Sequence, residues 1–127
     1  MAHRRDVGQR GEQVAADHLV RRGFWILQRN YRTRWGEIDI IACDGHTLAF
    51  CEVKSRRLRG SSTAVAEISP FDSLHPRKRV QVRRMAQRWI GERFQRPYAS
   101  VIRFDAIGVT FDCRGELLRL EHLEGAF

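Results

Sequence analysis

Residues 36–55 constrain the fold most strongly, because two apolar segments meet there at Asp44-Gly45. Residues 36–43 and 46–55 each have the length and the β-branched or aromatic content of a buried strand. Asp-Gly between such segments is the strongest short signal for a hairpin, because a type I′ turn needs positive φ at both central positions. We therefore predict two antiparallel strands joined by a two-residue loop at Asp44-Gly45.

The loop length also predicts which residues lie opposite one another. The expected pairs are Cys43 with His46, Ile41 with Leu48, Asp39 with Phe50, and Glu37 with Glu52. Because side chains alternate across a strand, one face is predicted to be wholly apolar, with Ile38, Ile40, Ala42, Ala49, Cys51 and Val53. The other face carries Ile41, Leu48 and Phe50 near the turn, then Glu37, Asp39, Glu52 and Lys54 at the open end. Both faces are largely apolar, which predicts a central hairpin covered on each side.

The charged end of the second face is the candidate site. Asp39 and Glu52 are expected as diagonal neighbours with Cβ atoms roughly 7–8 Å apart, close enough to share one cation. Mg²⁺ prefers oxygen ligands, commonly one or two carboxylates completed by water and substrate phosphates. Lys54 would hold the attacking water or stabilise charge developing on phosphorus. The alternative is a structural ion-pair cluster in which Lys54 simply neutralises Glu52.

The rest of the chain alternates between helical and strand patterns. Apolar residues recur at helical spacing over 6–22, residues 24–31 resemble a strand, and a long helix is expected to start near Pro76. Further strands are expected over 100–110 and 117–123, and the polar stretch 56–73 is expected to be a mobile loop. With 43% apolar and 30% charged residues, residues 1–127 are predicted to form one α/β domain with a mixed central sheet flanked by helices.

Positive charge is in excess and is concentrated in two places. The formal net charge is +8, which favours polyanionic partners such as nucleic acid. Of the 23 Lys and Arg residues, only Lys54 and Lys78 are lysines. The expected nucleic-acid contacts follow Lys54 or crowd the second helix: Arg56, Arg57, Arg77, Lys78, Arg79 and Arg83, with Arg59, Arg84 and Arg88 nearby. An ordinary solvated helix face is the alternative for the second group.

The remaining polar and aromatic residues carry weaker signals. Cys43, Cys51 and Cys113 form no metal-binding or disulfide pattern and are expected to be small apolar thiols. Trp25, Trp35 and Trp89 could stack on bases, although the helical register of Trp89 predicts a core position. The chain enters charged sequence directly after Met1, without an apolar stretch, so a cytoplasmic protein without membrane association is expected.

These motifs resemble a known arrangement. Gly36-Glu37-Ile38-Asp39 followed by Glu52-Val53-Lys54 is similar to the D…E-x-K signature of the PD-(D/E)XK nuclease superfamily, with Ile38 in place of the proline. Over nearly its full length the chain is also similar to the YraN-like family of small bacterial proteins, which is likened to archaeal Holliday-junction resolvases. The shared segments include 8–12, 30–32, 76–78, 103–105 and 121–127.

This resemblance implies a restriction-endonuclease-like fold with an αβββαβ core. It also implies that Asp39 and Glu52 ligate Mg²⁺ or Mn²⁺, that Lys54 assists catalysis, and that Glu12 is a further acidic residue of the site. Helical spacing lets Glu12 face the sheet; the alternative is a first-turn glutamate that interacts with the helix dipole.

The expected function is therefore a metal-dependent endonuclease that hydrolyses phosphodiester bonds and selects structure rather than base sequence. DNA is expected in preference to RNA, and a homodimer is left open. One rival is a non-catalytic nucleic-acid-binding module on the same fold. Another is a structural adaptor whose basic face meets an acidic protein.

Overall fold

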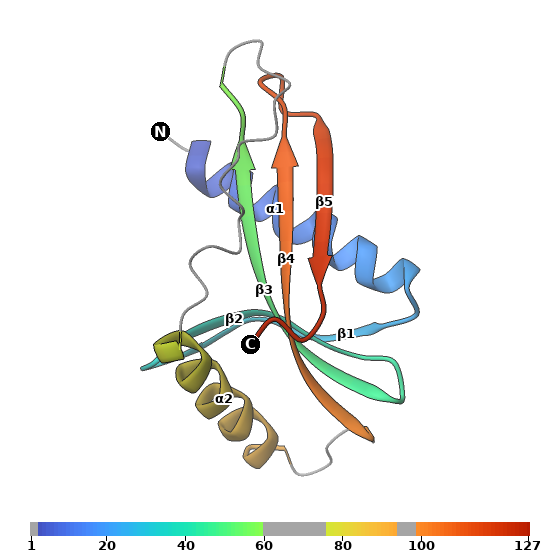
Figure 1. The fold of residues 1–127 in the computed structure, drawn as a ribbon, viewed down its shortest axis with the longest axis vertical. Helices are drawn as coiled ribbons and strands as arrows, with labels where there is room; N and C mark the ends of the chain where they lie inside the picture. The colour runs from blue at the N-terminus through green and yellow to red at the C-terminus, as the bar shows by residue number, and fades with distance from the viewer. Residues whose placement is uncertain (1–2, 60–75, 94–98) are drawn as a thin grey trace.

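A computed structural model describes residues 3–59, 76–93 and 99–127 (Figure 1). Its elements are α1 (His3–Arg21), β1 (Trp25–Thr33), β2 (Gly36–Cys43), β3 (Thr47–Arg57), α2 (Pro76–Gly91), β4 (Val101–Phe111) and β5 (Leu117–Leu123). The five strands form one sheet in the order β1-β2-β3-β4-β5. The β3–β4 pair is parallel and the other three pairs are antiparallel. The predicted α/β fold with a mixed sheet flanked by helices is confirmed.

The predicted element boundaries need two corrections. The first helix begins at His3 rather than Asp6, and Arg56 and Arg57 belong to the end of β3 rather than to a loop. Most of the loop predicted over 56–73 lies outside the described residues. Of the two helices that the structure describes, neither has the length and apolar character needed to span a bilayer.

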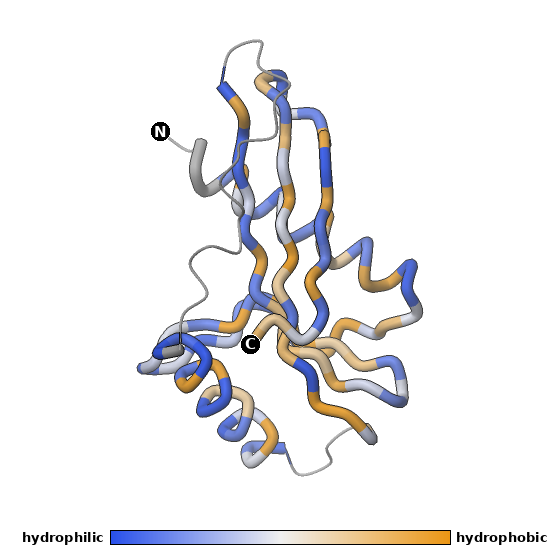
Figure 2. The backbone as a smooth tube through the Cα atoms, viewed as in Figure 1, coloured by the Kyte–Doolittle hydropathy of each residue, from blue (hydrophilic) through white to orange (hydrophobic). Residues whose placement is uncertain are grey.

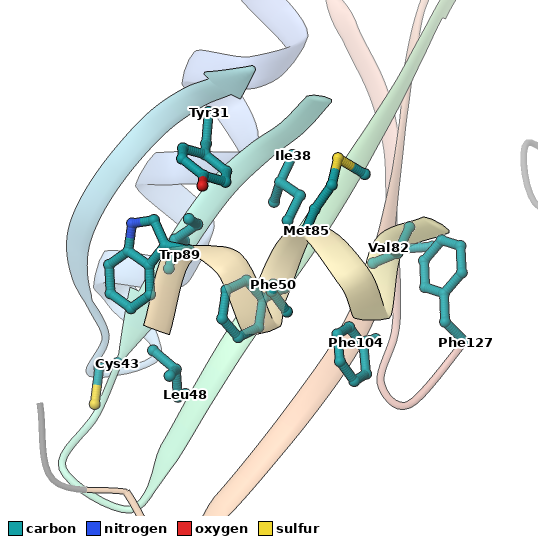
Figure 3. Packing of buried hydrophobic residues seen from close by; sticks show 13 residues of the cluster. Tyr31, Ile38, Cys43, Leu48, Phe50, Val82, Met85, Trp89, Phe104 and Phe127 are labelled. Carbon is teal, nitrogen blue, oxygen red and sulfur yellow. The ribbon is translucent and has the colours of Figure 1, made fainter. Parts of the chain in front are cut away.

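The face of the sheet below α2 carries an aromatic core (Figure 3). Figure 2 shows that apolar and hydrophilic residues alternate along α2, as expected for a helix with one buried stripe. That stripe packs on the sheet through Val82, Met85, Ala86 and Trp89. Phe50 meets Trp89 edge-on, with ring centroids 5.8 Å apart, and stacks on Phe104 at 5.7 Å. The predicted core position of Trp89 is thus confirmed.

The opposite face of the sheet packs under α1. Ala15, Ala16 and Leu19 are buried there against strand residues that include Ile40, Ala42, Ala49, Cys51, Ile107 and Val109. These alanines are small, which lets the helix lie close to the strands. The buried thiols of Cys43 and Cys51 are core residues as predicted, whereas Cys113 is exposed.

Gly11 marks the closest approach of α1 to β3. A Cβ atom at this position would lie 1.7 Å from Ser55 Oγ and 2.7 Å from Ser55 Cβ. We expect Gly11→Ala to lower the free energy of unfolding by about 1–3 kcal/mol, because the helix must shift away from a packed strand. Gly8→Ala is the matched control, since its Cβ would meet nothing within 4 Å. Urea unfolding of both variants tests this, and equal stability of the two would contradict the close approach.

The β2–β3 hairpin differs from the predicted register by two residues. Cys43 pairs with Leu48 and Ile41 with Phe50, so the predicted partners of these residues are wrong. The reason lies in Asp44, whose Oδ1 accepts the backbone N–H groups of His46 at 2.9 Å and Thr47 at 2.7 Å. Asp44 thereby precedes the turn instead of forming its first central residue. An even shift keeps side chains on the same face, so the faces near the turn are as predicted.

Candidate active site

The regular alternation of β2 breaks next to Asp39. The last pair between β2 and β3 is Ile40 with Cys51; beyond it, Asp39 Oδ2 accepts the backbone N–H of Val53 at 2.7 Å. Ile38 is buried in the core on the α2 side, although the prediction placed it on the face that packs under α1. The strand therefore turns as it leaves its neighbour, and Asp39 points to the α1 side.

Asp39 lies in a large cleft between the first half of α1 and the ends of β2 and β3. The cleft has a volume of about 1060 Å³ and also contains Glu12. Its lining includes four arginines, Arg32, Arg56, Arg57 and Arg59. A pair of acidic groups therefore sits in a hollow whose other charged walls are mostly basic.

Two carboxyl groups of the cleft, those of Asp39 and Glu12, have raised pKa values. Burial raises the pKa of Asp39 to about 7, and the nearby carboxylates of Glu12, Glu37 and Glu52 add to the rise, although the Val53 N–H opposes it. Burial also raises the pKa of Glu12, whose carboxyl group lies close enough to that of Asp39 for the two to interact. In the parts of the chain that the structure describes, no basic side chain forms an ion pair with Asp39.

Glu12 faces the sheet side of α1, as the helical spacing predicted. It lies in the middle of α1, which spans His3–Arg21. The alternative explanation as a first-turn residue interacting with the helix dipole is therefore wrong, because that effect fades beyond the first turn.

Glu52 lies in a second, smaller cavity of about 330 Å³, which it shares with Lys78, Val82, Met85 and Phe127. Its Oε1 atom forms ion pairs with Lys54, at 3.2 Å, and with Lys78. Its Oε2 atom is buried without a hydrogen-bond partner in the described part of the chain. A buried carboxylate oxygen in this state is costly unless something pairs with it.

The structure thus forms two pairs, Glu12 with Asp39 and Glu52 with Lys54. The prediction that Asp39 shares one face with Glu52 and Lys54 is wrong, because β2 turns as it leaves β3. Glu37 contributes to the linings of both cavities, and the charge of Glu52 contributes to the raised pKa of Asp39. The pairs therefore adjoin and interact through their charges.

The donor chemistry fits a hard divalent cation, although a complete ligand shell is not assembled. In the described part of the chain Asp39 forms no ion pair and Glu52 Oε2 has no hydrogen-bond partner. Carboxylate oxygens are the ligands that Mg²⁺ prefers. Among residues 3–59, 76–93 and 99–127, no three His, Cys, Asp or Glu side chains gather closely enough to hold a metal ion. Water and substrate oxygens would have to supply the remaining positions.

The basic residues predicted to bind nucleic acid are placed differently from one another. Arg77, Arg79, Arg83, Arg84 and Arg88 are exposed on α2, and Arg83 lies over the Phe104 ring at 4.8 Å. Arg56 Nε donates to Thr110 Oγ1 at 3.1 Å and Arg57 Nε donates to the Cys113 carbonyl at 3.2 Å. Trp25 is 63% exposed on β1, which leaves its ring accessible for stacking.

Sequence reasoning missed the contact between Lys78 and Glu52, and the place of Arg32 in the cleft. A signal for the first was present: Lys78 precedes Val82 by four residues, so helical spacing places it on the buried stripe of α2. Its side chain is only 27% exposed. No comparable signal marked Arg32.

Comparison with known proteins places this architecture in a family. The model of the uncharacterised protein family UPF0102 matches residues 11–109, which include all four candidate site residues. The chain belongs to the UPF0102 family. A UPF0102 protein of Frankia casuarinae is 43% identical over 123 residues, covering 95% of each chain. UPF0102 proteins of Geobacter metallireducens and Rhodococcus opacus are 36% and 35% identical over 125 and 127 residues, with at least 94% of each chain covered. The YraN-like family resemblance is thereby confirmed.

Proposed function

We propose that this UPF0102 protein is a metal-dependent endonuclease that hydrolyses phosphodiester bonds of nucleic acid. The observation that carries the proposal is the cleft in which Asp39 and Glu12 lie together beside Arg32, Arg56, Arg57 and Arg59. Arginines attract and hold phosphates, while the acidic pair would repel them unless a cation lay between. Metal-dependent phosphodiester hydrolysis combines both features: ligands for a cation and groups that hold phosphates.

The side chains have separable roles in this proposal. Asp39 and Glu52 would hold Mg²⁺ or Mn²⁺, and Glu12 would orient Asp39 or a water molecule by hydrogen bonding. When bound, the cation would supply Lewis-acid activation of the scissile phosphate and of the attacking water. Lys54 would stabilise negative charge that develops on the phosphoryl oxygens, and the arginines of the cleft would hold the backbone on either side.

The proposed substrate is DNA in preference to RNA, recognised by its structure. Contacts to phosphates position a nucleic acid without reading its sequence, and the cleft is lined by groups suited to phosphates. Within this proposal the protein acts in the cytoplasm, where nucleic acid and Mg²⁺ occur together.

The test is a cleavage panel of branched, flapped, duplex and single-stranded DNA and RNA with Mg²⁺ or Mn²⁺. We expect cleavage of at least one DNA structure that EDTA abolishes and that Lys54→Ala reduces by about 100-fold, since one charge-stabilising group commonly contributes 10²–10³. Arg114→Gln, an exposed arginine outside the cleft lining, is the control for loss of one positive charge. Equal rates for wild type and Lys54→Ala would remove the catalytic assignment.

A non-catalytic nucleic-acid-binding module is the second candidate. It is favoured by the incomplete ligand set and by the two lysines that occupy Glu52 Oε1. Binding without turnover in either metal, with unchanged affinity in Lys54→Ala, would support it over the nuclease.

A further inference from the structure

Both lysines of this arginine-rich chain bind the same atom. Lys54 comes from β3 and Lys78 from the first turns of α2, and both ammonium groups form ion pairs with Glu52 Oε1. Lys54 lies two residues after Glu52 on the same strand face, so it can neutralise this carboxylate without help from α2. Lys78 therefore adds a second positive charge to a carboxylate that already has one.

Stability does not account for Lys78. It lies on the buried stripe of α2, one turn before Val82, in a cavity with Met85 and Phe127. An apolar side chain there would extend the packing of the stripe, and Lys54 would still pair with Glu52 Oε1. Within the described residues, neither Glu12 nor Asp39 forms an ion pair, although arginines line their cleft. Both lysines are thus placed on Glu52 and not on the adjoining acidic pair.

We propose that Lys78 is a positioning residue that competes with the divalent cation for Glu52. In the metal-free protein its ammonium holds Oε1 and keeps the carboxylate in the cavity below α2. A cation that binds through Oε2 competes with Lys78 for the negative charge of the same carboxylate, so the cation binds more tightly when Lys78 releases Oε1. This inference rests on the proposed metal site and assigns Lys78 to that site, instead of to the basic residues of α2 that are predicted to contact nucleic acid.

Through this competition, cation binding would affect how firmly the start of α2 is held on β3. While Lys78 is engaged, the first turns of the helix are fastened to β3 through Glu52. Release of Lys78 removes that link and leaves the helix held by the apolar stripe from Val82 to Trp89. The start of α2 is therefore expected to differ in mobility between the two states.

The experiment measures Mn²⁺ binding to the full chain by isothermal titration calorimetry, without nucleic acid. We expect Lys78→Met to bind Mn²⁺ about tenfold more tightly than wild type, because a neighbouring positive charge that competes for a ligand oxygen has been removed. Lys78→Arg, which keeps the charge, should stay within about twofold of wild type. Arg84→Met removes an exposed positive charge from the same helix and controls for long-range electrostatic effects of losing one charge. Its Mn²⁺ affinity should also stay within about twofold of wild type.

Two further measurements separate competition from a loss of structure. Thermal unfolding identifies any variant that fails to fold, and Lys78→Gln repeats the test with a polar side chain. The double variant Glu52→Gln/Lys78→Met should lose the gain in affinity, since the ligand itself is gone. Unchanged or weaker Mn²⁺ binding in both Lys78→Met and Lys78→Gln would overturn the proposal, as would a gain that persists in the double variant.

Failure of this inference is distinguishable from failure of the proposed function. Tighter Mn²⁺ binding in Lys78→Met without any nucleic-acid cleavage would remove the nuclease and support the competition. Metal-dependent cleavage by wild type with no change in Mn²⁺ affinity in Lys78→Met would support the nuclease and remove the competition.

Discussion

Asp39→Asn is expected to lower Mg²⁺-dependent cleavage by about 1000-fold or more, because a metal contributes several kcal/mol of transition-state stabilisation. Asparagine keeps the size of the side chain and can still accept the Val53 N–H. The place where β2 turns away from β3 should therefore keep its structure. It removes the negative charge that the cation needs. Single-turnover cleavage with saturating Mg²⁺ measures the effect, and retention of even a tenth of the rate would contradict the role of Asp39.

The same substitution is expected to stabilise the metal-free protein at high pH. The folded state raises the pKa of Asp39 from 3.8 to about 7, so folding favours the protonated form. This contribution to stability is present in full below about pH 4 and is lost as the pH rises to about 7. Three pKa units correspond to about 4 kcal/mol as an upper bound, and water in the open cleft reduces the expected gain of Asp39→Asn to about 2 kcal/mol.

Urea unfolding from pH 4 to pH 8 in EDTA tests this effect. The two proteins should match near pH 4, and the variant should become progressively more stable toward pH 8. Glu116→Gln is the control, because Glu116 is an exposed carboxylate outside the cleft. If the difference in free energy of unfolding between wild type and Asp39→Asn stayed constant across this pH range, Asp39 would have an ordinary pKa in the folded state. Added Mg²⁺ should reduce the difference in free energy of unfolding between the two proteins, because it stabilises wild type alone.

Asp105→Asn is expected to lower the free energy of unfolding by about 3–5 kcal/mol, as for other buried charges that lose their partner. The Asp105 side chain is fully buried and accepts hydrogen bonds from Arg103 Nε at 2.9 Å, His122 Nε2 at 2.8 Å and the Gly125 backbone at 3.0 Å. Burial alone would raise the pKa of Asp105, but the hydrogen bonds from His122 and Arg103 outweigh it and lower the pKa. An amide cannot accept all of these bonds or balance the guanidinium.

Glu124→Gln is the matched control for Asp105→Asn. Glu124 also pairs with Arg103, at 3.5 Å, but its side chain is 46% exposed, so we expect a change below about 0.5 kcal/mol. Urea unfolding at pH 7 compares the two variants. A loss below about 1 kcal/mol in Asp105→Asn would indicate that water replaces the missing contacts.

The sequence predicted the elements well because each has a strong local signal. Apolar periodicity and Gly or Pro boundaries define α1, α2 and the five strands to within a few residues. The register of the β2–β3 hairpin was not predicted, since it depends on whether the Asp44 side chain or the backbone closes the turn. Regular alternation of side chains could not predict that Ile38 and Asp39 face the opposite sides of the sheet from those expected. The exchange occurs because β2 turns where it leaves β3.

The candidate site was predicted in part. Glu12, Asp39, Glu52 and Lys54 do adjoin, and α1 does bring Glu12 to the sheet. Glu12 and Asp39 lie in one cavity and Glu52 in another because β2 turns, and the ion pair between Glu52 and Lys78 depends on how α2 packs on the sheet. The network around Asp105 joins β4, β5 and the end of the chain, so no local pattern could reveal it.

The parallel pairing of β3 with β4 has a consequence for folding. It joins residues such as Arg56 and Thr110, which are 54 positions apart in the sequence, whereas β1, β2 and β3 follow one another through short turns. Closing the longer connection carries a greater entropic cost before any contact forms. Glu12, Asp39, Glu52 and Lys54 all lie before that connection, so the acidic residues are expected to come together early, and the arrival of α2 and β4 to set the folding rate.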